Sequence, residues 1–192
     1  MTALLDTYLR TVANVGDLHR ARAQALGVPL ETIWAAPASF GVARIETSGR
    51  YFQIAATGRP ALILPASTCY DDIDLFVEGL ADLVAFHTDD PSHWWVLRDA
   101  VPVLNLDAVA WSQPCMGIDH ALAVYSTPLS FLQHDRDGVC VLDWQSSVWF
   151  DLAGPVRVWC DTPELEIRLR NAWSGPLDQM PEIRSGEARH AA

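Results

Sequence analysis

Near the N-terminus, hydrophobic positions recur at intervals of three and four residues. This stripe consists of Leu4, Leu5, Tyr8, Leu9, Val12, Val15, Leu18 and Ala25. The spacing predicts an amphipathic helical segment that packs one face on a core and ends near Gly27, with Gly16-Asp17 as a break into two pieces. A second short helix is expected over residues 28–36, and Pro37 would stop it.

From residue 42 the pattern becomes typical of strands and short turns. Two runs around Ser48-Gly49-Arg50 predict a β-hairpin, and residues 61–66 predict a buried strand. Residues 69–83 have apolar side chains at helical spacing. Residues 83–87 and 93–98 then predict a second hairpin across the turn-rich segment 88–92.

The second half continues in this style. Residues 129–134 and 139–144 flank Asp135-Arg136-Asp137-Gly138, a turn sequence that predicts a hairpin, and Ala153-Gly154 predicts another. Residues 118–127 fit either a helix or a strand, whereas residues 163–173 predict a helix that begins at Pro163.

These elements predict the α+β class, with an N-terminal helical segment followed by mainly antiparallel β-hairpins and one or two packed helices. No linker or internal repeat is visible. We expect a single compact domain over residues 1–174 and a loose C-terminal tail over residues 175–192, which is rich in Pro, Gly and charge.

Charge and composition exclude several classes of function. All 13 basic residues are Arg, which excludes a Schiff-base lysine and a P-loop. The net charge of −11 divides into +2 for residues 1–68, −7 for residues 69–99 and −6 for residues 100–192. Such an acidic chain repels phosphate backbones, so direct nucleic-acid binding is not expected.

No apolar run approaches a membrane span, and the first residues lack the layout of a secretory signal, so we expect a cytoplasmic protein without a membrane partner.

The acidic stretch also contains two of the eight Trp residues. Neighbouring residues of a strand point to opposite faces, so one of Trp94 and Trp95 is expected to be exposed. Exposed Trp is typical of protein contact sites. The predicted partner-binding residues are Asp71, Asp72, Asp89, Asp90, Trp94 and Trp95.

The nucleotide-binding, hydrolase and zinc-protease motifs are all missing from the sequence. We therefore expect a non-enzymatic acidic interaction or accessory protein of a phage, plasmid or host system. It would bind a protein partner and need no cofactor.

A different function follows from the segment Leu75-Phe76-Val77-Glu78-Gly79-Leu80-Ala81-Asp82. It resembles the Glu-Gly element of toprim domains, in which a strand delivers a Glu and a later Asp-x-Asp completes a Mg²⁺ site for phosphoryl transfer. The resemblance implies metal binding by Glu78, Asp135 and Asp137, and a Mg-dependent nucleic-acid enzyme. The helical spacing around Glu78 and the turn composition around Asp137 favour ordinary structural roles for the same residues.

Three more hypotheses each rest on a single feature of the chain. His87 and His93 flank an acidic turn and would suit a transition metal. Residues 23–33 have the spacing of a helix-turn-helix motif. The many Trp residues leave room for an aromatic small-molecule pocket. Segments such as GVARIE and GVCVLDW resemble uncharacterised proteins of GC-rich alphaproteobacteria and their mobile elements, a resemblance that implies no mechanism.

Overall fold

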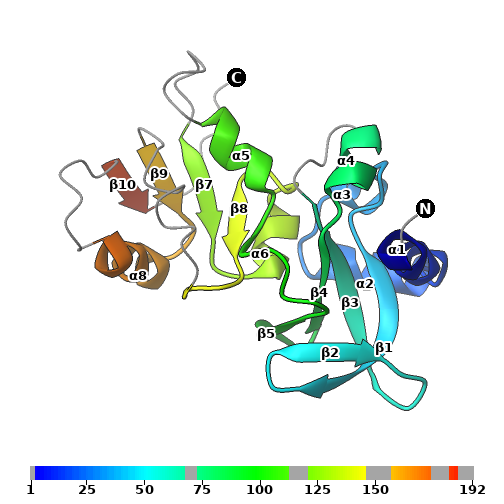
Figure 1. Ribbon diagram of the computed structural model, residues 1–192. Helices are drawn as coiled ribbons and strands as arrows, with labels where there is room; N and C mark the ends of the chain where they lie inside the picture. The colour runs from blue at the N-terminus through cyan, green and yellow to red at the C-terminus, as the bar shows by residue number, and fades with distance from the viewer. Residues whose placement is uncertain (1–2, 68–72, 113–120, 146–156, 174–181, 186–192) are drawn as a thin grey trace.

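A closed barrel and a second, five-stranded sheet lie next to one another, with helices packed against both (Figure 1). The computed structural model describes residues 3–67, 73–112, 121–145, 157–173 and 182–185. The α+β class and the N-terminal helical segment that precedes the strands are confirmed. No helix in these ranges is long and apolar enough to cross a membrane.

The N-terminal segment forms three helices beside the barrel (Figure 1). They are α1 (Ala3–Ala13), α2 (Asp17–Ala25) and α3 (Leu30–Ile33). The chain breaks between α1 and α2 at Gly16, as expected, and the Tyr8 hydroxyl ties α1 to the loop before the barrel by donating to the Ala38 carbonyl at 2.6 Å. The helix-turn-helix interpretation is wrong because α3 has only 4 residues, too few for a recognition helix.

The barrel consists of strands in the order β1-β2-β5-β4-β3. Their bounds are β1 (Gly41–Ser48), β2 (Tyr51–Ile54), β3 (Arg59–Ala66), β4 (Asp82–His87) and β5 (Asp90–Val96). Neighbours are antiparallel, except that β2 meets β5 in parallel through Tyr51 and Val96. Both predicted hairpins of this region are confirmed, and helix α4 (Ile73–Gly79) lies between β3 and β4.

The second sheet has the order β10-β9-β7-β8-β6, and all its pairs are parallel except β6 with β8. Its strands are β6 (Val103–Leu104), β7 (Leu122–Tyr125), β8 (Val139–Val141), β9 (Arg157–Cys160) and β10 (Glu182–Ser185). The accompanying helices are α5 (Leu106–Trp111), α6 (Pro128–Gln133) and α8 (Pro163–Trp173). The helix predicted over 163–173 is confirmed, and the ambiguous segment 118–127 contains strand β7.

The hairpin predicted across residues 129–144 is wrong. Its first arm is helix α6, because the Thr127 hydroxyl caps the helix by accepting from the Ser130 N–H at 3.0 Å and Pro128 suits the first turn. The turn Asp135–Gly138 therefore joins a helix to a strand. Residues 182–185, expected in a loose tail, form edge strand β10. The hairpin expected around Ala153-Gly154 has its turn outside the described residues, but its second arm contains strand β9, which lies between β7 and β10 and is parallel to both rather than paired in a hairpin.

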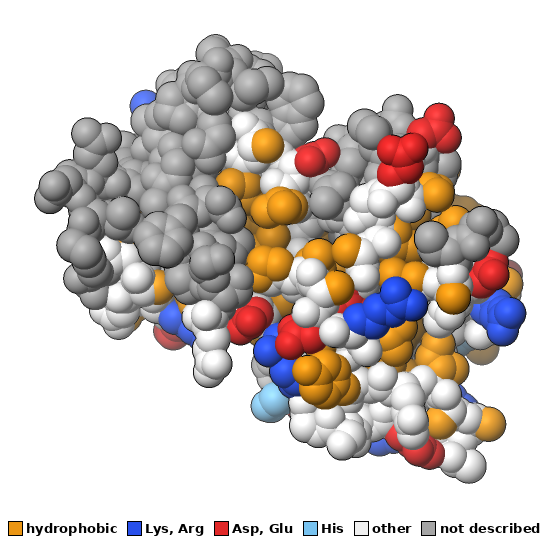
Figure 2. All heavy atoms as spheres, viewed as in Figure 1, with side chains coloured by type: hydrophobic (Ala, Val, Ile, Leu, Met, Phe, Trp, Pro, Cys, Tyr) orange, Lys and Arg blue, Asp and Glu red, His pale blue; other side chains and the backbone are white. Residues whose placement is uncertain are grey.

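One hydrophobic cluster extends from the barrel into the second sheet. It contains Phe86 and Val96 of the barrel together with Phe131 and Leu132 of α6, all at most 2% exposed. A separate cluster lies between α8 and the sheet. On the face shown in Figure 2, hydrophobic side chains form a band between the two halves, with charged side chains of both signs at its lower end.

Candidate functional site

The three residues implied by the toprim resemblance lie in different local structures. Glu78 is exposed on helix α4, not at the end of a strand, and strand β8 follows Asp137 where that family has a helix. The Asp135 carboxylate accepts a hydrogen bond from the Thr32 hydroxyl at 2.7 Å. Among the described residues, no three His, Cys, Asp or Glu side chains gather closely enough to hold a metal ion.

The two histidines at the β4–β5 turn differ in environment. His87 is 4% exposed, and its Nδ1 lies 2.8 Å from the Pro60 carbonyl oxygen, so this nitrogen donates to the backbone. The His93 side chain is 72% exposed, with its Nδ1 2.8 Å from the Asp90 carboxylate. Hydrogen bonds from His93 and Ser92 lower the pKa of Asp90. The structure therefore directs one imidazole inward and the other toward solvent.

The two described aspartates of the predicted partner surface both have side-chain partners. Asp89 pairs with Arg59 at 2.9 Å, and Asp90 interacts with His93. Trp94 and Trp95 are both half-buried and pack against the core cluster. The expectation that one of them is exposed is therefore wrong. Asp71 and Asp72 lie outside the described residues.

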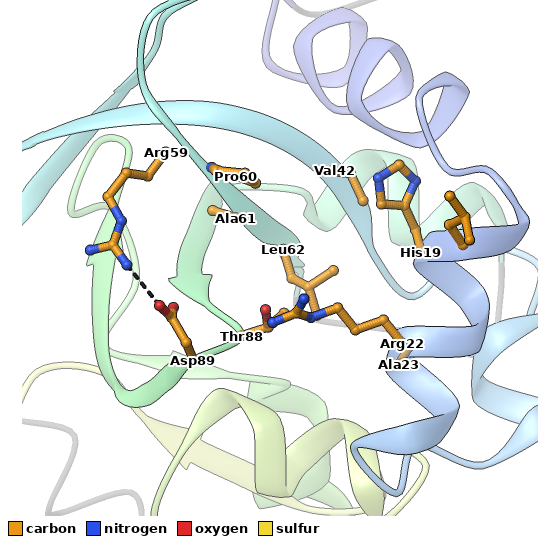
Figure 3. A pocket seen from close by; sticks show the side chains of 11 residues that line it. His19, Arg22, Ala23, Val42, Arg59, Pro60, Ala61, Leu62, Thr88 and Asp89 are labelled. Atoms are coloured by element: carbon orange, nitrogen blue, oxygen red, sulfur yellow. Dashed lines mark hydrogen bonds and ion pairs between the residues drawn. The ribbon is translucent and has the colours of Figure 1, made fainter.

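A pocket of about 630 Å³ opens between helix α2 and the barrel (Figure 3). We name it the α2–β3 pocket. It is lined by Leu18, His19, Arg22, Ala23, Val42, Arg59, Pro60, Ala61, Leu62, Thr88 and Asp89. Amphipathic helix α2 positions one wall, strands β1 and β3 form an apolar floor, and the β4–β5 turn closes the far side. Volumes of this size suit small molecules.

Two arginines face this apolar floor from opposite sides (Figure 3). Arg59 is paired with Asp89, whereas Arg22 makes no ion pair with any described residue. The Gly16 N–H donates to His19 Nδ1 at 3.1 Å, so the neutral imidazole carries its proton on Nε2. Leu18 is 85% exposed and adds an apolar edge. The pocket thus combines apolar contact area with one cation that lacks a counter-ion within the described part of the chain.

Comparison with family models, curated proteins and solved structures finds no match for this chain.

Neither of the two described cysteines is suited to act as a nucleophile. Cys140 and Cys160 are fully buried, and burial raises the pKa of Cys160 to about 12 and that of Cys140 well above its ordinary value. A protonated thiol is a poor nucleophile. Cys69 and Cys115 lie outside the described residues.

Sequence reasoning did not predict that Leu18, His19 and Arg22 line a pocket. The sequence analysis placed Leu18 in the apolar stripe that packs on the core, whereas the structure leaves this side chain 85% exposed. The available signal was only His19 and Arg22 on one helix within residues 1–68, the part of the chain with a positive net charge. The helical pattern alone could not show that this face lies opposite β3.

Proposed function

We propose that this protein is a non-catalytic binding protein whose α2–β3 pocket takes up a small amphipathic anion, an apolar body with one carboxylate. The observation that carries the proposal is Arg22, a cation at an apolar floor with no ion-pair partner among the described residues. Guanidinium groups bind carboxylates through charge-assisted hydrogen bonds, and the floor offers contact to hydrocarbon.

The local charge favours a ligand with a single negative charge. Arg22 and Arg59 together with Asp89 leave the lining with a net charge of about +1, whereas the whole chain carries −11. A polyanion would gain little from this small positive region and would be repelled by the remainder of the surface. A compact monoanion gains the local attraction at little cost from the distant charges, because salt screens them.

The experiment compares octanoate with octanol by isothermal titration calorimetry. The two probes share the hydrocarbon chain and differ in charge. We expect octanoate to bind more tightly, and Arg22→Gln to weaken octanoate about tenfold, which corresponds to one lost charge-assisted hydrogen bond of about 1.4 kcal/mol.

Arg20→Gln is the matched control. Arg20 lies on the same helix, pairs with Asp17 at 3.2 Å and covers the Trp34 ring at 4.4 Å, away from the pocket lining. Its loss should leave octanoate binding unchanged. Equal affinity for octanoate and octanol, or equal effects of the two variants, would contradict the proposal.

We propose, as a second candidate, the protein contact expected from the sequence at the β4–β5 turn. The supporting observation is that the Asp89 and His93 side chains remain 62% and 72% exposed beside Trp94. Charge reversal at Asp71, Asp72, Asp89 and Asp90 should abolish partner recovery in cross-linking experiments, with Asp107→Arg as the control. Unchanged recovery would sink this candidate.

A further inference from the structure

A second pocket of about 590 Å³ lies where the barrel meets the second sheet. We name it the Trp94–Trp144 pocket. Its lining is Arg50, Ser92, His93, Trp94, Val96, Leu142, Asp143, Trp144, Gln145 and Arg168. Strand β5 supplies one wall, the segment after β8 supplies another, and α8 contributes Arg168. Junctions of this kind are frequent ligand sites.

The two arginines of this pocket have different partners. Arg50 bridges the two halves, at 2.7 Å from Asp99 and 3.8 Å from Asp143. Arg168 instead lies over the Trp144 ring, with its guanidinium carbon 3.9 Å from the ring centroid, and makes no ion pair among the described residues. Partial burial lowers the pKa of Arg168, as expected for a desolvated cation without a carboxylate.

The indole side chains of this pocket favour a planar aromatic ligand. Trp94 is half-buried against the core cluster, and Trp144 is also half-buried, so each contributes apolar ring surface to the pocket wall. Rings of this type stack on planar aromatic groups, and a guanidinium beside them adds attraction for an anion.

We infer that the Trp94–Trp144 pocket is a second binding site, for a planar aromatic group that carries a negative charge. The ring of the ligand packs against the indoles, and its anionic group pairs with Arg168. This site shares no lining residue with the α2–β3 pocket, so its occupancy does not depend on the proposed function.

Two pairs of probes test this chemistry by calorimetry. Adenosine monophosphate is compared with adenosine, and naphthoate with naphthylmethanol. Each anion should bind at least tenfold more tightly than its neutral partner. A preference for the nucleotide pair identifies a mononucleotide as the ligand source, and a preference for the naphthyl pair identifies an aromatic acid.

Variants on helix α8 separate this site from non-specific charge effects. Arg168→Gln should weaken the anions about tenfold and leave the neutral probes and octanoate unchanged. Arg170→Gln is the control, because Arg170 pairs with Glu166 at 2.9 Å on the same helix and does not line the pocket. Trp144→Leu should weaken charged and neutral aromatic probes alike.

Three results would each overturn the inference. One is equal binding of anions and their neutral partners. Another is wild-type affinity in Arg168→Gln. The third is binding of ribose phosphate, which lacks the aromatic ring, as tight as that of adenosine monophosphate.

Discussion

The carboxylate of Asp82 is completely buried at the start of β4 and faces backbone N–H groups from three residues. It accepts from Leu83 at 2.7 Å, and from Arg98 and Ala100 at 2.9 Å each. Buried carboxylates are tolerated when such donors satisfy their oxygens. Asp82 therefore holds the chain that leaves β5 against β4. In sequence, Asp82 ends the segment that resembles the toprim Glu-Gly element, and its spacing does not show that the carboxylate meets backbone N–H groups, so its structural role could not be predicted.

Asp82→Asn should lower the free energy of unfolding by about 2–3 kcal/mol, because the amide NH₂ would face a backbone donor and leave it unpaired. Urea unfolding measures this as a lower midpoint with an unchanged slope. Asp137→Asn, at an exposed position, should cost less than about 0.5 kcal/mol. Equal costs for the two variants would show that the Asp82 bonds contribute no net stability.

The Cys160 thiol makes the free energy of unfolding depend on pH. Burial, followed by the charges of Glu166 and Asp161, raises the pKa of its thiol to about 12. The unfolded thiol ionises near pH 8.5, so this contribution to stability is complete below that pH and is lost as the pH rises towards 12. At pH 8 the buried thiol of the folded protein is therefore protonated and unreactive. Iodoacetamide should therefore spare Cys140 and Cys160 in the native protein and modify both in urea, as peptide mass spectrometry can show. Rapid native labelling would contradict the burial.

At the scale of elements, alternation and turn residues predicted the barrel hairpins correctly, because antiparallel neighbours are joined by short local turns. The same reasoning failed for the second sheet. Parallel strands need a crossover, and α6 is a helix of 6 residues whose apolar content suits a strand equally well. The Thr127-Pro128 start was the signal that favoured a helix.

The turn after α6 requires glycine at position 138. Its φ is +120°, and a Cβ there would meet the carbonyl oxygen of Ala123 in β7. Gly138→Ala should cost about 3 kcal/mol or more, because strain and the clash add. Gly49→Ala is the matched control, since its φ is +59° and its Cβ would meet nothing within 4 Å. It should cost about 1 kcal/mol. Thermal unfolding would contradict the account if both variants lost the same stability.

At the scale of the whole molecule, the shared cluster makes the barrel and the second sheet one hydrophobic unit. Leu132 of α6 is fully buried in this cluster, and α6 contacts β5 of the barrel as well as β7 and β8. Leu132→Ala should cost about 2–5 kcal/mol and shift the unfolding curves from circular dichroism and Trp fluorescence together. Separate transitions would show that the two sheets unfold independently.

The two pockets also depend on the packing of the whole molecule. Both pockets combine segments that are distant in sequence: α2 with β3 in one, and β5 with α8 in the other. The sequence predicts Asp89 and Trp94 as partner-binding residues and His93 as a metal ligand, and the structure places all three in the linings of these pockets. Since Arg59 comes from β3 and Arg168 from α8, their charges reach the pockets only through tertiary packing.

The most direct test of the central claim is an amide NMR titration of the protein with octanoate. The account predicts saturable shifts at Leu18, His19 and Arg22 of α2, at Leu62 of β3 and at Thr88, and their loss in Arg22→Gln. Shifts centred on Trp94 and Trp144, or shifts that persist unchanged in Arg22→Gln, would contradict the assignment of the anion site to the α2–β3 pocket.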